Sequence, residues 1–216
     1  MKRRYWFAIL PFVVLGAGAV AFSPPTVSPE DSATSVIRKP ELLNRAWDLP
    51  VAATYEHQVT WQSNGSLCGP ASVANAFRSL GEPADTEREV LDETGLCWTG
   101  YCILGLTLDE LADVARKHTK RKVTVLRDLT PDQFREHLRS SNDSHRRYII
   151  NFTREQIFGK GVGHHSPIGG YLEAEDLVFV IDVNRKFQPW LVERSRLFSA
   201  MDTFDGDKKR GLLLIE

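Results

Sequence analysis

A candidate nucleophile, Cys68, lies in the 216-residue chain directly before Gly69 and Pro70. The preceding residues predict a turn, and the following ones predict a helix that begins at Cys68 itself. Backbone N–H groups at the start of a helix stabilise negative charge, so they favour the thiolate, which is the reactive form of cysteine. Gly69 allows a substrate to approach the backbone closely. The alternative is a buried structural cysteine that behaves as a small hydrophobic residue.

Two consecutive histidines, His164 and His165, lie among glycines at the start of a predicted strand. A histidine beside a thiol can serve as its ion-pair partner and general base. Successive side chains of a strand point to opposite faces, so we expect only one of the two to face Cys68. Gly163 allows a ligand to approach the backbone closely. Ordinary turn histidines are the alternative.

Two further side chains are suited to complete such a site. Asp182 follows the apolar run 177–181, so we expect it to be half-buried and to need a partner. An imidazole N–H is a fitting partner and would fix the tautomer of the base. Gln62 precedes Cys68 by six residues, and its amide can donate to an oxyanion beside the Cys68 N–H. The alternative for Asp182 is a strand end in solvent.

The elements that must position these residues change in kind along the chain. Apolar periodicity and capping residues predict helices over 40–47 and 68–80 and from Thr107 and Thr130 onward. Alternating or continuous apolar runs predict strands over 57–62, 148–152, 165–172, 177–183 and 212–215. A helical first half followed by a strand-rich second half indicates an α+β domain with an antiparallel sheet.

The first 39 residues are expected to comprise an export segment followed by a tether. Basic residues at 2–4 precede an uncharged apolar run over 5–22 that ends in small residues. This pattern predicts a signal peptide over residues 1–21, and an uncleaved membrane anchor is the alternative. Prolines then predict an extended tether over residues 22–39. We therefore expect a periplasmic protein, or one anchored to the membrane and facing the periplasm.

Composition excludes several classes of protein. The chain is 42% hydrophobic and 25% charged, which excludes collagen, a disordered tail and a multi-span membrane protein. Its net charge of −1 provides no basic field to recruit nucleic acid. The three cysteines are too few for a disulfide scaffold. In an oxidising compartment we expect Cys97 and Cys102 to pair, and a metal site is the weaker alternative because no histidine is adjacent.

The residues described above resemble the catalytic domain of phytochelatin synthase in its short bacterial form. The resemblance covers residues 40–216. Its matching stretches are 62–80, 105–112, 151–171, 182–190 and 200–211.

The resemblance implies a papain-like fold. It implies that Cys68 is the nucleophile, His164 rather than His165 the base, Asp182 its orienting group and Gln62 part of the oxyanion hole. The reaction implied is attack on the Cys–Gly bond of glutathione, which releases glycine and leaves a γ-glutamylcysteinyl thioester. Water then hydrolyses the thioester, or a second glutathione accepts the acyl group and begins a phytochelatin.

The resemblance also implies residues that bind substrate. Asp205 and Arg210 match a γ-glutamyl clamp, in which Asp holds the α-ammonium and Arg grips the α-carboxylate. A solvated loop is the alternative. Arg185 lies in a stretch that the resemblance associates with the acceptor substrate, and this stretch is shorter here than in the family. Gly163 completes the candidate binding set.

Other expectations concern cofactors, partners and rival functions. No cofactor is expected, and Cd or Zn would enter as thiolate complexes of the substrate. The sequence lacks the cysteine-rich C-terminal domain of the larger synthases, so the resemblance does not imply metal control or polymerisation for this chain. A membrane partner is expected only if the N-terminal segment stays uncleaved, and a homodimer is left open. The rival functions are a papain-like peptidase for short peptides and a non-catalytic thiol- or metal-binding module that uses Cys97 and Cys102.

Overall fold

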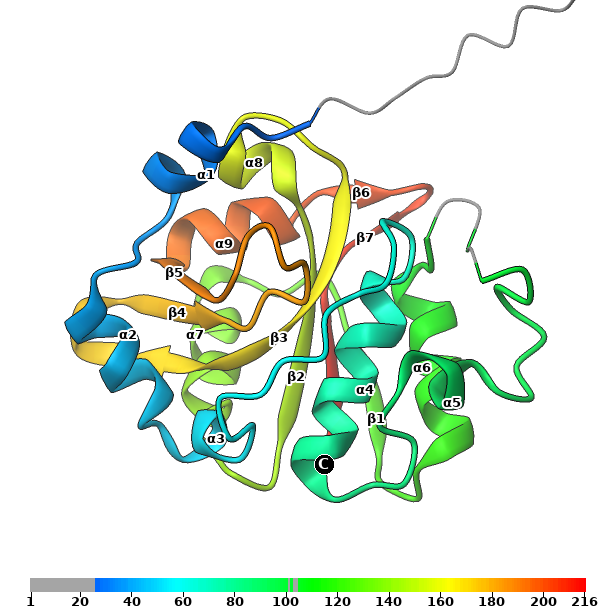
Figure 1. The fold of residues 1–216 in the computed structure, drawn as a ribbon. Helices are drawn as coiled ribbons and strands as arrows, with labels where there is room; N and C mark the ends of the chain where they lie inside the picture. Colours follow the sequence, from blue (N-terminus) through cyan, green and yellow to red (C-terminus); the bar gives the residue numbers. More distant parts are fainter. Residues whose placement is uncertain (1–25, 101, 103–104) are drawn as a thin grey trace, which may run out of the picture.

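The centre of the fold is one six-stranded sheet in which every pair of neighbours is antiparallel, in the order β1-β8-β2-β3-β4-β5 (Figure 1). The computed structural model describes residues 26–216 except 101, 103 and 104. The strands are β1 Val123–Leu126, β2 Arg147–Thr153, β3 Gly163–Leu172, β4 Leu177–Val180, β5 Trp190–Glu193 and β8 Leu212–Ile215.

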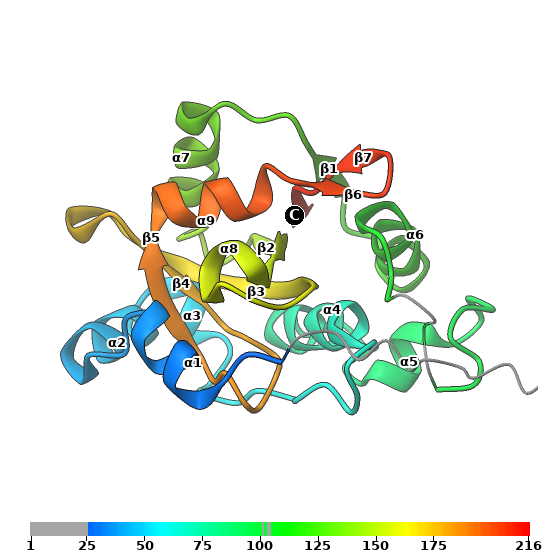
Figure 2. The same cartoon turned by 90° about the horizontal axis from the view of Figure 1, so that it is seen from above.

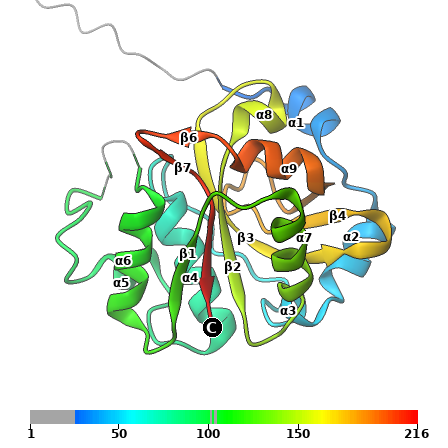
Figure 3. The same ribbon diagram turned by 180° about the vertical axis from the view of Figure 1, so that it is seen from behind.

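Helices cover both faces of this sheet (Figure 2). The helices on one face, visible from behind in Figure 3, are α1 Pro29–Ser35, α7 Pro131–Ser140, α8 Arg154–Phe158 and α9 Arg194–Met201. Those on the other face are α2 Pro40–Trp47, α3 Pro50–Ala53, α4 Cys68–Leu80 and α6 Leu108–His118, and α5 Glu87–Leu91 packs beside α4. A short 3₁₀ turn, Glu173–Glu175, joins β3 to β4.

The core is divided by the sheet because strand side chains alternate between its faces. Tyr148, Ile150 and Phe152 of β2 pack with α7 and α9, whereas Ile149 packs with α4 and α6. On the second face, a separate cluster joins β4 and β5 to α2 and α3. The site described below lies where α4 meets the sheet.

A small two-stranded ribbon, β6 Phe204–Asp205 and β7 Lys208–Lys209, precedes β8. It lies at the same end of the molecule as the N-terminal end of α4 (Figure 1). Residues from the last part of the chain are thereby brought beside Cys68.

Most of the predicted elements are confirmed, as is the α+β class. The helices over 40–47 and 68–80 have the expected bounds, and those after Thr107 and Thr130 begin with the expected capping boxes. The strands expected over 148–152, 165–172, 177–183 and 212–215 correspond to β2, β3, β4 and β8.

The strand predicted over 57–62 is wrong. Glu56 and His57 have φ values of 52° and 54°, which belong to a tight turn. Downstream, the Asn75 side chain accepts from the Thr60 N–H over 2.9 Å and donates to the Thr60 carbonyl over 2.8 Å. A helix side chain therefore takes the hydrogen bonds that a neighbouring strand would have made.

The extended tether predicted over 22–39 is wrong in its described part. Ser28 and Asp31 form a capping box and Pro29 occupies the first helical position, so the prolines start helix α1. Val27 and Val36 are buried in the core, and this segment belongs to the folded domain. The expected signal peptide, residues 1–21, lies outside the described residues. Within the described part, no helix is long and apolar enough to cross a membrane.

Candidate active site

Cys68 is the first residue of α4, as its sequence context predicts. The thiol is free and only 6% of the residue is exposed. Leu67 occupies the N-cap position, and its side chain makes no capping hydrogen bond to the helix. The first turn of α4 therefore offers its N–H groups to whatever negative charge forms on or beside the sulfur.

Both histidines, rather than one, interact with Cys68, which corrects the expectation from strand alternation. His165 Nδ1 lies 3.8 Å from the Cys68 Sγ. His164 also acts on the thiol through its charge, which lowers the pKa of Cys68. The pairing of β3 with β4 begins only at Ile168, so the start of β3 has an open edge on that side. A sulfur atom at this edge can be reached by side chains of both faces.

Asp182 holds His164 within a fully buried network. Its Oδ1 accepts from His164 Nε2 over 3.1 Å, from Arg154 Nη2 over 2.9 Å and from the Asn184 N–H over 2.9 Å. Its Oδ2 accepts from Trp190 Nε1 over 3.0 Å. The sequence predicted a half-buried carboxylate, but Asp182 is 0% exposed. The bond to Nε2 leaves Nδ1 as the ring nitrogen of His164 that is available to the thiol.

The pKa shifts in this cluster favour an ion pair. Burial raises the pKa of Cys68, but the two histidines outweigh it and bring that pKa well below its usual value. Burial and Arg154 act to lower the pKa of His164, but the Asp182 and Cys68 charges raise it overall. Burial also raises the pKa of Asp182, but Arg154 and His164 hold it far below its usual range. These directions correspond to a thiolate, an imidazolium and a carboxylate.

Gln62 is fixed close to this cluster. Its N–H donates to the Val183 carbonyl over 2.8 Å, and Val183 packs against Cys68. Its Nε2 donates to the Asn64 carbonyl over 2.7 Å, while its Oε1 is buried without a partner. An amide nitrogen carries two hydrogens, so Nε2 keeps one donor for an oxyanion.

Asp205 and Arg210 are brought together as the resemblance implies. Arg210 Nη1 lies 3.1 Å from Asp205 Oδ2 and donates to Asn151 Oδ1 over 2.8 Å. Asn151 Nδ2 in turn donates to Asp205 Oδ2 over 2.9 Å. A Cβ on Gly163 would lie 2.5 Å from Arg210 Nη1, so the glycine makes room for the guanidinium. Burial lowers the pKa of Arg210, while the charges of Asp205 and Cys68 act to raise it.

Two residues of this site, Asn151 and Arg154, were missed by sequence reasoning. Each had a signal in the sequence, because Asn151 is an amide inside an apolar strand and Arg154 is a charge directly after that strand. Both are buried. Conversely, Arg185 is exposed and forms no ion pair among the described residues, and no contact joins it to Cys68, His164 or Asp182.

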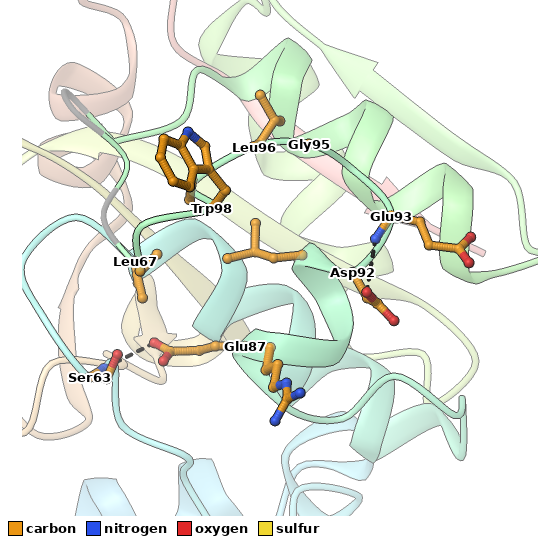
Figure 4. Close-up of a pocket in the computed structure, with 12 residues that line it drawn as sticks. Ser63, Leu67, Glu87, Asp92, Glu93, Gly95, Leu96 and Trp98 are labelled. Atoms are coloured by element: carbon orange, nitrogen blue, oxygen red, sulfur yellow. Dashed lines mark hydrogen bonds between the residues drawn. The ribbon is translucent and has the colours of Figure 1, made fainter.

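Cys97 and Cys102 form a disulfide. Among the described residues, two hydrogen bonds tie this disulfide loop, residues 97–102, to the nucleophile turn, residues 62–67. The Cys102 N–H donates to Ser66 Oγ over 3.1 Å, and Asn64 Nδ2 donates to the Gly100 carbonyl over 2.9 Å. The loop and α5 border a cavity of about 530 Å³, which Ser63 and Leu67 also line (Figure 4).

No described group of three or more His, Cys, Asp or Glu side chains is arranged to hold a metal ion.

Comparisons with known proteins show the family of this chain and agree with its fold. The family model described as phytochelatin synthase matches residues 27–212. Glutathione gamma-glutamylcysteinyltransferase 2 of Arabidopsis thaliana is 36% identical over 168 residues, which cover 71% of this chain and 37% of that protein. Glutathione gamma-glutamylcysteinyltransferase 1 of Triticum aestivum is 32% identical over 157 residues, with 67% and 31% covered. The Schizosaccharomyces pombe transferase is 29% identical over 117 residues, with 52% and 28% covered. The chain thus spans about a third of the length of these relatives.

Two solved structures share the fold. A C39-like peptidase from Bacillus anthracis aligns with a TM-score of 0.54 and 14% identity, covering 75% of this chain and 95% of that one. The peptidase domain of Streptococcus ComA aligns with a TM-score of 0.50 and 14% identity, covering 73% and 96%. They confirm the predicted papain-like fold.

Proposed function

This chain belongs to the phytochelatin synthase family, and from that premise we propose that it cleaves the Cys–Gly bond of glutathione through a thioester on Cys68. The observation that carries the proposal is the buried Cys68 thiol beside His164, whose other ring nitrogen is hydrogen-bonded to Asp182. A thiolate paired with an oriented imidazolium is the arrangement that nucleophilic acyl transfer requires.

The first half of the reaction forms the thioester. The Cys68 thiolate attacks the carbonyl carbon of the Cys–Gly bond, and the resulting oxyanion accepts from the Cys68 N–H and from Gln62 Nε2. The tetrahedral intermediate collapses as the C–N bond breaks. His164 gives its proton to the departing glycine amine and becomes neutral. The γ-glutamylcysteinyl group remains on the sulfur.

The second half regenerates the enzyme. Neutral His164 takes a proton from water, or from the amine of a second glutathione, as that nucleophile attacks the thioester carbonyl. The C–S bond then breaks, the acyl group leaves as γ-glutamylcysteine or as a lengthened peptide, and the thiolate–imidazolium pair is restored. The stretch around Arg185, which the resemblance associates with binding the acceptor, is shorter here than in the family, and this leads us to favour hydrolysis over chain growth.

Specificity for a γ-glutamyl group would come from Asp205 and Arg210. A free α-ammonium would bind Asp205, and the neighbouring α-carboxylate would replace part of the Asp205–Arg210 pairing on the guanidinium. Asn151, which contacts both side chains, would hold the two at their spacing.

The test compares two isomeric peptides. Purified protein is incubated with glutathione or with α-glutamyl-cysteinyl-glycine, with and without cadmium, and the products are identified by mass spectrometry. We expect glycine release from glutathione only, and its loss in Cys68→Ala, which has no nucleophile. Equal cleavage of both isomers would support the peptidase instead. Thiol or metal binding that is unaltered in Cys68→Ala would support the non-catalytic module that uses Cys97 and Cys102.

We also propose that the protein is exported and works without a cofactor, with Cd or Zn entering only as a thiolate complex of glutathione. The Cys97–Cys102 disulfide supports an oxidising compartment. N-terminal sequencing of protein from the periplasmic fraction should begin at residue 22. A chain retained intact in the membrane fraction would instead support the anchor.

A further inference from the structure

His165 contacts the nucleophile directly although the proposed reaction gives it no role. Its Nδ1 lies 3.8 Å from the Cys68 Sγ, within hydrogen-bonding range for sulfur, and the residue is 3% exposed. The imidazole of His165 is therefore shielded from water, and the sulfur is the polar atom that its Nδ1 contacts.

The contact depends on the residue after the nucleophile. A Cβ on Gly69 would lie 3.1 Å from Leu111 Cδ1 and 3.7 Å from His165 Nδ1. The glycine thus lets the imidazole and the first turn of α4 approach each other closely. The sulfur, at the same turn, meets the ring at its Nδ1 edge.

The other ring nitrogen indicates the protonation state of His165. His165 Nε2 is buried and has no hydrogen-bond partner. A protonated ring would leave a charged N–H unpaired in the interior, which is the costly arrangement, whereas a neutral ring with its hydrogen on Nδ1 leaves only an acceptor unpaired. Unlike His164, this ring makes no contact with Asp182 that would favour its charged form.

We propose that His165 is a second, neutral hydrogen-bond donor to the Cys68 thiolate, a positioning residue that holds the sulfur while His164 carries the proton. This deepens the proposed function and rests on it. During acylation His164 loses its proton to the glycine amine, and it regains one only as the second nucleophile attacks. When the thioester breaks, the electrons of the C–S bond return to sulfur, and the Nδ1–H of His165 is already in place beside the restored imidazolium to stabilise that anion. His165 itself gives up no proton.

The surroundings of the sulfur make a weak donor effective. The groups that act on Cys68 are the charged His164 and the hydrogen-bonding His165 from β3 and the charged Arg210 from the segment before β8, with Asp182 acting through His164. Both histidines act to lower the pKa of Cys68 against the effect of burial, His164 more than His165. At a buried sulfur, a charge-assisted hydrogen bond is stronger than in solvent.

The test measures the thiol without any glutathione. The rate of alkylation of Cys68, the free cysteine, by iodoacetamide is followed against pH in the wild type, His165→Phe and His165→Asn. Phe keeps a ring of similar size and lacks the donor, while the Asn amide can place a donor near the position of Nδ1. In His165→Phe we expect the midpoint of the alkylation-rate profile to rise by about one pH unit, so that at a pH below the midpoint the thiolate population falls tenfold. In His165→Asn we expect the midpoint to stay near that of the wild type.

Coincident profiles for the wild type and His165→Phe would overturn the proposal, as would an Asn variant that behaves like Phe. If His165→Phe does not fold, ¹⁵N NMR of the wild-type imidazoles decides. We expect His165 to be neutral with hydrogen on Nδ1 and to shift when Cys68 is alkylated, and a protonated or Nε2–H ring would contradict this. Alkylation does not need the acyl-transfer reaction, so failure here is distinct from failure to release glycine.

Discussion

The sheet side and the helix side of the site hold their functional groups by different means. On the sheet side, Asp182 is fully buried and accepts four hydrogen bonds, from two cationic side chains, an indole and a backbone N–H. Each of these partners is held in turn by the sheet or by its flanking segments. The base of the proposed reaction therefore has one position available to it.

On the helix side, the nucleophile turn over residues 62–67 is a partly exposed loop. Asn64 organises it by accepting from the N–H and the hydroxyl of Ser66, and the disulfide loop fastens it from outside. Hydrogen bonds from one side chain and a disulfide thus hold the turn, in place of the buried network of the sheet side. We infer that the base has a fixed position and that the turn before the nucleophile can adjust. The predictions below test this difference, from the largest expected effect to the smallest.

Asp182→Asn should have the largest effect. The substitution leaves the Arg154 charge buried without its counterion, so we expect a loss of about 3–5 kcal/mol in the free energy of unfolding. It also removes the group that orients His164, and glycine release should fall by about 10⁴-fold. Urea unfolding and glycine release measure the two effects. Asp109→Asn, which breaks a surface pairing with Arg127 and Lys208, is the control. Equal costs for the two variants would contradict the contrast between the sides.

Acid should weaken the sheet side first. The pKa of Asp182 is held far below its usual value by Arg154 and His164 against the effect of burial. A depressed folded-state pKa contributes stability that is present above the unfolded value, about 3.9, and lost as pH falls toward the folded value. Unfolding free energy should therefore drop by about 3 kcal/mol more in the wild type than in Asp182→Asn between pH 5 and pH 2. Parallel pH curves would show that Asp182 is not the group responsible.

Opening the disulfide should have an intermediate effect on the helix side. For so short a loop, the entropy model gives about 2 kcal/mol of stabilisation. Replacing both Cys97 and Cys102 with serine should lower stability by about that amount and slow glycine release less than Asp182→Asn does. Reductant should affect the wild type in the same way and leave the double variant unchanged. A response of the double variant to reductant would place the sensitive group elsewhere.

Asn64→Ala should have the smallest effect, about 1 kcal/mol, since it removes hydrogen bonds of a partly exposed turn. Asn64→Asp keeps the acceptor for Ser66 but loses the donor to the Gly100 carbonyl. We expect the aspartate variant to retain most of the stability and to weaken only the link to the disulfide loop. Thermal unfolding of the two variants measures this, and a larger loss in aspartate than in alanine would reverse the assignment.

Local signals predicted the elements better than the contacts between them. The capping boxes at Thr107 and Thr130 and the Gly81 stop after α4 act within a few residues, so they can be read from sequence. Asp182 was found because a carboxylate after an apolar run needs a partner. These inferences depend on nearby residues or on the general cost of burial.

The misread parts depend on where distant segments meet. Strand alternation placed one histidine away from Cys68, but the end of β4 pairing at Ile168 lets the sulfur reach both. The strand predicted over 57–62 failed because Asn75, a residue of α4, takes its hydrogen bonds. Asn151 acquires its place only through Asp205 and Arg210, more than fifty residues later. No local pattern contains this information.

The hydrogen bonds from Asn64 to the Gly100 carbonyl and from the Cys102 N–H to Ser66 link the nucleophile turn to the disulfide loop. The proposed substrate is a thiol, and a thiol can also open a disulfide by exchange. Glutathione would then act on this protein in two opposite ways. It is the acyl donor at Cys68, and it is also a reductant that opens the disulfide beside the nucleophile turn. The rate of turnover would then depend on the ratio of reduced to oxidised glutathione as well as on the total glutathione concentration. The Cys97–Cys102 disulfide would in this way make the activity sensitive to redox balance.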